Sequence, residues 1–233
     1  MLAVILAAGH GSRLMPLTKE IPKPMLKINE KPFLEYLILQ LKRDGITDIL
    51  ICVGHMSEKI IDYFGDGSIF DVKIKYSKSK IMGTAGELKN AENILKNHDN
   101  FIVMNGDSIF DVNINELIEF HEKNNSIASV CLRKIKDVHR YGAVIINDEK
   151  MITNFSEKSI NGAGLINAGI YVINNKVFDL IPSGTSSIEK DIFPQIINQD
   201  GLFGTLKEGF FIDIGTPDDY KRAQNEIKKV VLW

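Results

Sequence analysis

The sequence predicts an α/β fold: one domain built as a doubly wound, Rossmann-like three-layer αβα sandwich around a mixed, mostly parallel sheet. Three observations support this class. Strand-like apolar runs alternate with segments of helical periodicity along the chain. The 233 residues suit a single domain with a sizeable core. No low-complexity run, internal repeat or linker interrupts them. We therefore expect ligands at the carboxyl ends of the strands, where open α/β sheets bind them.

The first half of the chain carries the clearest elements. Residues 3–6 form an apolar strand that runs into a turn at 7–12. A helix is expected at 32–44, where apolar residues recur at helical spacing until Gly45, a suitable C-terminal cap. A strand, a short helix, a strand, a helix and an apolar strand follow, at 49–53, 58–63, 72–76, 86–96 and 101–104. The last of these strands shows no alternation, as expected where helices cover both faces, so the sheet should be parallel in this half.

The chain ends in a charged helix at 218–229 and an apolar tail at 230–233. The sequence leaves open whether this tail closes the core or meets another subunit in a homo-oligomer. His121 and His139 fall on segments expected at the surface, and we interpret both as solvated.

Composition limits the classes of function. A net charge of −2 gives no reason to expect nucleic-acid binding. The first apolar segment ends at Gly9, too early for a signal peptide or a membrane span. Cys52 and Cys131 lie in apolar runs and make neither a disulfide framework nor a zinc site, which favours buried thiols in a reducing compartment. We expect a cytoplasmic protein without nucleic-acid or membrane partners.

The turn after the first strand suits phosphate oxygens. Gly9 and Gly11 allow backbone N–H groups to approach a phosphate closely, and Arg13 and Lys23 supply positive charge. The alternative is a plain turn with two solvated cations. It is the weaker interpretation, because a proline on each side of Lys23 fixes the backbone around that side chain.

Three common phosphate-binding loops do not fit this turn. A P-loop has four residues between its glycines and then Gly-Lys, whereas one residue separates Gly9 from Gly11. A dinucleotide fingerprint needs a third glycine where this chain has Leu14. The HRD and DFG motifs of kinases are absent from the sequence.

The two pieces Gly9–His10–Gly11–Ser12–Arg13–Leu14 and Pro22–Lys23–Pro24 together resemble the signature of the sugar-1-phosphate nucleotidylyltransferases. The resemblance implies a glycosyltransferase-A-like fold, a nucleoside triphosphate and a sugar 1-phosphate as substrates, and Arg13 and Lys23 as catalytic residues. Residues 82–88 resemble the family's Leu-Gly-Thr-Ala/Gly-Gly loop, although a glycine turn with a helix cap at Thr84 is an alternative. The implied nucleotide-binding residues are Leu6, Ala8, Gly9, Gly11, Ser12, Arg13, Gly83, Thr84 and Ala85.

Two aspartates follow strands and match the family's metal ligands. Asp107 comes after the strand at 101–104, and Asp213 ends the apolar run at 210–212. Strand ends on one sheet edge can meet at one point, and magnesium is usually held by one or two carboxylates with phosphate oxygens. Taken singly, each aspartate could instead bond local backbone N–H groups. Together with the glycine turn they predict a Mg²⁺ site.

Later motifs resemble the sugar-binding side of the family. They are Tyr141–Gly142, Glu157–Lys158 and the run 167–171. Ser159 stands where the family has proline, which loosens that loop and weakens the assignment of Lys158. The implied sugar-binding residues are Asn105, Gly142, Glu157, Lys158 and Asn167. The nucleotide-binding half then covers about residues 1–110 and the sugar-binding half about 111–233.

The resemblance implies that the sugar phosphate attacks the α-phosphorus of the triphosphate and that pyrophosphate leaves. The short chain and the ending around Asp213 are most similar to heptose 1-phosphate guanylyltransferases, with mannose-1-phosphate guanylyltransferases similar in the first half. GTP with a sugar phosphate of manno configuration is the expected substrate pair. A uridylyl-, cytidylyl- or thymidylyltransferase stays open, as does a non-catalytic relative that binds a nucleotide sugar.

Overall fold

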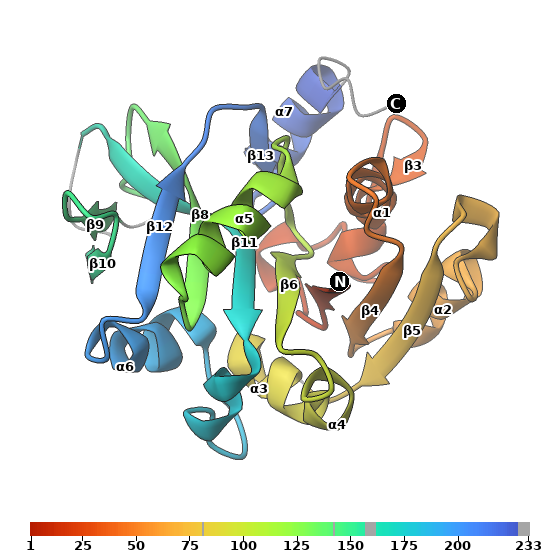
Figure 1. Cartoon of the computed structure of the whole chain (residues 1–233). Coiled ribbons are helices and arrows are strands. Elements are labelled where there is room, and N and C mark those ends of the chain that lie inside the picture. Colours follow the sequence, from red (N-terminus) through yellow and green to blue (C-terminus); the bar gives the residue numbers. More distant parts are fainter. Residues whose placement is uncertain (81, 142, 157–161, 228–233) are drawn as a thin grey trace.

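The computed structural model describes residues 1–80, 82–141, 143–156 and 162–227. In this part of the chain a nine-stranded sheet runs in the order β10-β9-β11-β6-β1-β4-β5, with β8 beside β11 and β12 beyond β8 (Figure 1). Its strands are β1 (Leu2–Ala7), β4 (Asp48–Val53), β5 (Lys73–Lys78), β6 (Asn100–Asn105), β8 (Ala128–Ile135), β9 (Ala143–Ile146), β10 (Ile152–Ser156), β11 (Gly164–Asn174) and β12 (Leu202–Leu206).

Helices cover both faces of this sheet. Successive strand residues point to opposite sides, so apolar strands place side chains in a core on each face. In β1, Ala3 and Ile5 belong to one core cluster, whereas Val4 and Leu6 belong to the other. The first cluster includes side chains of α1 (Phe33–Arg43), α2 (Ser57–Phe64), α5 (Ile114–Asn124) and α7 (Pro217–Glu226). The second includes those of α3 (Gly83–Asn90), α4 (Glu92–Leu95) and α6 (Phe193–Ile197). The predicted three-layer αβα sandwich is therefore confirmed.

The sheet is mixed, as predicted. Strands β6, β1, β4 and β5 are parallel neighbours, which confirms the parallel first half. Strand β11 runs antiparallel to both β6 and β8, while β12 is parallel to β8. The carboxyl ends of β1 and β6 therefore lie side by side.

Two short ribbons and several single turns complete the described chain. Strand β7 (Ser108–Phe110) pairs antiparallel with β13 (Phe211–Asp213), and β2 (Lys27–Ile28) pairs with β3 (Lys31–Pro32). The turns are the 3-10 segments η1 (Ser12–Leu14), η2 (Lys23–Met25), η3 (Ser68–Phe70) and η4 (Asn175–Asp179) and the π-helical η5 (Ile188–Ile192). The β7–β13 ribbon matters most, because each of its strands borders a predicted site aspartate.

Two predictions need correction. The helix expected at 86–96 is two helices, α3 and α4, separated at Ala91, and the first begins at Gly83. His121 is not solvated: it is 2% exposed, and its ring nitrogens contact Ser129 Oγ (3.0 Å) and Asn100 Oδ1 (3.2 Å).

Two other expectations, the glycine after α1 and the buried thiols, are confirmed. Helix α1 ends at Arg43, and Gly45 follows it with a positive φ of 79°. Cys52 and Cys131 are buried free thiols, and burial raises the pKa of Cys131 to about 12. No helix among the described residues is long and apolar enough to cross a bilayer.

Candidate active site

The glycine turn is closed against Lys23. Gly11 adopts a positive φ of 65°, and a Cβ built on it would lie 2.9 Å from the Cβ of Lys23. The hydroxyl of Thr18 donates to the Gly11 carbonyl (2.9 Å), which ties the end of the turn to the next segment. A side chain at position 11 would therefore strain the backbone and displace Lys23.

Lys23 is a buried cation with an acidic partner. It opens the short turn η2 after Pro22 and is only 8% exposed. Its Nζ donates to Oδ2 of Asp107 (2.6 Å). Since a buried ammonium is costly unless it is paired, the ion pair fixes where the positive charge of Lys23 lies.

Asp107 is held beside the end of β1 by the glycine before it. The Gly106 N–H donates to the Leu6 carbonyl (2.9 Å), and a Cβ at position 106 would lie 2.5 Å from that oxygen. This close approach requires glycine. The side chain of Asp107 is 41% exposed, so its carboxylate is partnered by Lys23 and still reachable from solvent.

The β7–β13 ribbon brings Asp213 to Asp107. Asp213 is paired with Ser108 in the ribbon, and the N–H of Ile214 donates to the Asp107 carbonyl (2.9 Å). The two predicted metal ligands are 106 positions apart in sequence, yet they border one pocket.

Two hydrogen-bond donors and one cation surround the Asp213 carboxylate. The Gly215 N–H donates to Oδ1 (2.8 Å), and the Tyr141 hydroxyl donates to Oδ2. Nη2 of Arg140 lies 3.7 Å from Oδ1 while its guanidinium holds Asp219 with both nitrogens. Burial, followed by the contact with Asp213, raises the pKa of Tyr141 well above its usual value. The phenol therefore stays a donor, and the carboxylate has one fixed orientation.

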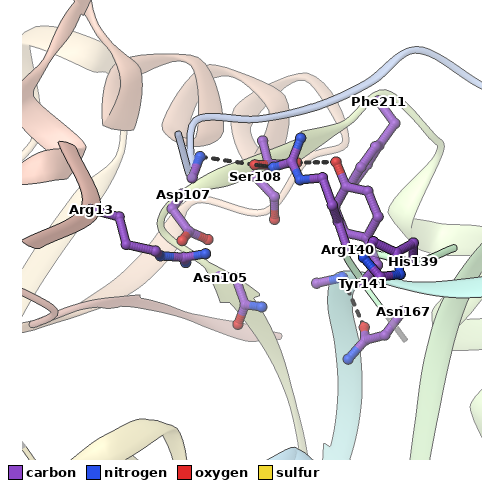
Figure 2. Close-up of a pocket in the computed structure, with 12 residues that line it drawn as sticks. Arg13, Asn105, Asp107, Ser108, His139, Arg140, Tyr141, Asn167 and Phe211 are labelled. Atoms are coloured by element: carbon purple, nitrogen blue, oxygen red, sulfur yellow. Dashed lines mark hydrogen bonds and ion pairs between the residues drawn. The ribbon is translucent and has the colours of Figure 1, made fainter. Parts of the chain in front are cut away.

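The largest pocket around these groups has a volume of about 470 Å³. In Figure 2, Arg13, Asn105 and Asp107 lie on one side of it, and Arg140 and Tyr141 lie on the other. Its walls are polar and charged, which suits a phosphorylated, hydroxyl-rich ligand. The residues that line it are Arg13, Asn105, Asp107, Ser108, His139, Arg140, Tyr141, Asn167, Gly169, Phe211, Asp213 and Gly215.

Two smaller pockets adjoin the large one, and Asp107 lines all three. One, of about 240 Å³, is lined by the glycine turn: Gly9, Gly11, Ser12, Arg13, Leu14, Lys23, Asp107 and Gly215. The other, of about 180 Å³, is lined by Leu6, Ala7, Gly9, Lys23, Pro24, Thr84, Glu87, Asn105, Gly106 and Asp107. The three pockets share lining residues and lie next to one another at the carboxyl ends of β1 and β6, and together they are called the cleft.

Three predicted nucleotide residues do not line this cleft in the described structure. Ala8 is 1% exposed and Ala85 fully buried, and Gly83 packs against Ser186, whose carbonyl oxygen would lie 2.5 Å from a Cβ at position 83. Thr84 does line the cleft, although its hydroxyl already donates to Glu189 Oε2 (3.0 Å). Of these four residues, only Thr84 contributes to the walls of the cleft.

On the predicted sugar side, two amides meet at one phenol. Asn167 Nδ2 donates to the Tyr171 hydroxyl (2.8 Å), which in turn donates to Glu189 Oε1 (3.2 Å). Asn105 Nδ2 lies 3.4 Å from the same hydroxyl, and its Oδ1 is buried without a hydrogen-bond partner. Asn105 lines two of the three pockets. The other predicted sugar residues, Gly142, Glu157 and Lys158, lie outside the described residues.

Several lining residues were missed by sequence reasoning. Ser108, His139, Arg140 and Phe211 line the large pocket, and Glu87 lines the smallest. Arg140 directly precedes the Tyr141–Gly142 motif, which was the single available signal. The position of its guanidinium depends on the ion pair with Asp219, which is 79 positions away, and no sequence spacing predicts that contact.

Asp107 and Asp213 form a donor set that fits a magnesium ion. Among the described residues no group of three or more histidine, cysteine, aspartate or glutamate side chains is arranged to hold a metal. Magnesium does not need one, since it is usually bound through one or two carboxylates with phosphate oxygens and water. Both aspartates border the large pocket, where phosphate oxygens could complete the coordination.

Known proteins resemble this chain over nearly its whole length. A family model described as nucleotidyl transferase matches residues 2–230. The chain is 35% identical over 233 residues to D-glycero-alpha-D-manno-heptose 1-phosphate guanylyltransferase of Aneurinibacillus thermoaerophilus, covering 99% of this chain and 100% of that one. It is 37% identical over 225 residues to mannose-1-phosphate guanyltransferase of Yarrowia lipolytica, covering 94% of this chain but 62% of that longer protein.

A solved structure shows the same fold. The crystal structure of HddC from Yersinia pseudotuberculosis complexed with GMP-PN superposes with a TM-score of 0.85 at 30% identity, over 97% of this chain and 99% of that one. The family match covers nearly the whole chain, and the relatives match over most of it. The chain therefore belongs to the nucleotidyl transferase family.

Proposed function

We propose that the chain transfers a guanylyl group from GTP to a heptose or mannose 1-phosphate and releases pyrophosphate. The observation that carries this proposal is the convergence of Arg13, Lys23, Asp107 and Asp213 on one cleft that continues to Asn105 and Asn167. The names of the similar heptose and mannose enzymes support the choice of GTP and sugar. The similar HddC structure, complexed with GMP-PN, agrees with a guanine nucleotide.

The reaction needs charge and alignment rather than a protein nucleophile. A phosphate oxygen of the sugar phosphate forms a bond to the α-phosphorus, and the bond from that phosphorus to the bridging oxygen breaks as pyrophosphate leaves. Arg13, which lines both the glycine-turn pocket and the large pocket, binds the β- and γ-phosphates. Lys23 neutralises charge at the α-phosphate or at the sugar phosphate.

We further propose that Asp107 and Asp213 hold Mg²⁺. Bound there, the ion would neutralise phosphate charge and align the attacking and departing oxygens. The chain's own contribution is to fix both carboxylates: Lys23 holds Asp107, and the Tyr141 hydroxyl with the Gly215 N–H holds Asp213. About residues 1–110 then bind the nucleotide and about 111–233 the sugar phosphate.

The decisive experiment is a pyrophosphate-release assay over a matrix of nucleoside triphosphates and sugar 1-phosphates, with and without Mg²⁺. We expect release with GTP and a sugar 1-phosphate of manno configuration, dependent on Mg²⁺. Nucleotide-sugar binding without release for any pair would indicate a non-catalytic relative. Preference for another base would correct the substrate and keep the reaction class.

A further inference from the structure

Glu87 is a buried carboxyl group in the smallest pocket of the cleft. It lies on α3, is 5% exposed, and shares that pocket with Leu6, Gly9 and Thr84. Its Oε2 is buried and has no hydrogen-bond partner. Glu87 falls in the loop motif at 82–88, but none of the roles proposed above uses its side chain.

The carboxyl group is costly where it lies. Its helix neighbours Ala85 and Leu88 belong to the apolar core. Burial raises the pKa of Glu87 to about 8, and a hydrogen bond from the Ala8 N–H only partly opposes that rise. Buried polar atoms are almost always partnered, so an unpartnered carboxyl oxygen at a pocket wall points to a ligand that supplies the missing donor.

We propose, on the basis of the guanylyl transfer proposed above, that Glu87 determines base specificity by accepting hydrogen bonds from the N1–H and the 2-amino group of guanine. Hydrogen bonds donated by a bound base would favour the ionised form of Glu87, which accepts with two oxygens and donates none. Guanine presents two adjacent donors on its Watson–Crick edge. Adenine, cytosine, uracil and thymine each present a single donor group there with an acceptor next to it, so a carboxylate that bonds to the donor faces a repulsive acceptor as well.

The position of Glu87 agrees with a base pocket. The pocket that Glu87 lines adjoins the glycine-turn pocket, and the two share Gly9, Lys23 and Asp107. A base seated beside Glu87 would therefore leave its phosphates at the glycine turn. The terminal torsion of glutamate is broad, so either oxygen can turn toward the base.

The test compares GTP with ITP, whose base keeps the N1–H and lacks the 2-amino group. Wild-type kcat/KM should favour GTP over ITP by about ten- to a hundredfold, the value of one hydrogen bond to a charged group. In Glu87→Gln this ratio should fall to within about threefold while turnover of ITP is largely kept. Glu92→Gln is the matched control, because Glu92 lies on α4 in ion pairs with Lys89 and Lys96 and lines none of the three pockets. It should keep the wild-type ratio.

An unchanged GTP to ITP ratio in folded Glu87→Gln would overturn the assignment. So would a wild-type preference for ATP, UTP, CTP or dTTP, even though nucleotidyl transfer would then stand. If no triphosphate supports turnover, the proposed function fails, and calorimetric affinities of the wild-type protein for GTP and ITP still decide the role of Glu87. Equal affinities for GTP and ITP would contradict the proposed role of Glu87. Because this comparison uses the wild-type protein, it also tests the proposal if Glu87→Gln does not fold.

Discussion

Lys23 and Asp107 form an ion pair, and substitution of either residue should lower turnover by a similar factor. Removing a positioned charge typically costs about 2.7–4 kcal/mol of transition-state stabilisation, or roughly 100- to 1,000-fold in turnover. We expect losses of this size for Lys23→Met and Asp107→Asn in the pyrophosphate-release assay. Lys42→Met, which removes an exposed ion pair with Asp71, is the control and should keep wild-type turnover. Near wild-type activity in folded Lys23→Met would refute its assigned role.

His121 should make the stability of the protein fall in mild acid. Burial lowers its pKa to about 4, so the fold keeps the ring neutral. Between pH 6.5 and about 4 the unfolded chain binds a proton that the folded chain does not. Acidification across this window therefore favours unfolding, by up to about 1.4 kcal/mol per pH unit for this one group.

Urea unfolding at a series of pH values measures this effect. Glu122 and other exposed carboxylates titrate in both proteins, so the informative quantity is the difference between wild type and His121→Gln. That difference should shrink steadily as the pH drops from 7 to 4.5. Parallel stability curves for the two proteins would show that His121 is not buried in its neutral form.

These residues also mark what a sequence can and cannot predict. Lys23 and Asp107 were predicted because local neighbours reveal them: flanking prolines in one case, a preceding strand in the other. His121 was misjudged because its burial depends on Ser129 and Asn100, which reach it from other elements. Glu87 was overlooked for the same reason, since only the folded chain puts it against the end of β1.

Among the elements, the first residue of α3 is determined by hydrogen bonds to a segment that is distant in sequence. The Ser186 carbonyl accepts the N–H groups of Ala85 and Gly86, and the Ser186 N–H donates to the Met82 carbonyl. A segment 100 residues away thus caps this helix, and Thr84, the local cap considered from the sequence, lies inside its first turn. Helix α1, by contrast, ends as predicted because its C-terminal signal, Gly45, is local.

The glycine turn allows a prediction with an internal control. Gly11→Ala combines an unfavourable positive φ with a Cβ that meets Lys23, whereas Gly45→Ala has a positive φ and no atom within 4 Å of its Cβ. Both variants should lose about 1–2 kcal/mol of stability. Only Gly11→Ala should also lose turnover, by about tenfold or more, because it displaces Lys23. Thermal unfolding and the pyrophosphate assay separate the two effects, and equal turnover losses would show that the turn does not position Lys23.

At the scale of the whole molecule, the sheet joins the two proposed substrate halves. Strand β11 from the second half pairs with β6 from the first, and each of its faces enters a different core. On one face Ile170 and Val172 pack with Met104 and Ile102. The sequence predicted the parallel first half from its apolar strands. It could not give the direction of β11, because an apolar run looks the same whichever way it pairs.

This shared construction predicts that the two halves fold only together. Fragment 1–110 would expose the β6 edge that β11 covers, together with the apolar faces that pack against it. We expect fragments 1–110 and 111–233 to lack a cooperative unfolding transition by far-UV circular dichroism. The full chain should unfold in one transition, with amides of β1 and β11 equally protected from hydrogen exchange. A cooperative transition in fragment 1–110, or much weaker protection of β11 than of β1, would mean that the substrate halves are separate folding units. The cleft would then lie between two bodies that can move, rather than along one continuous sheet.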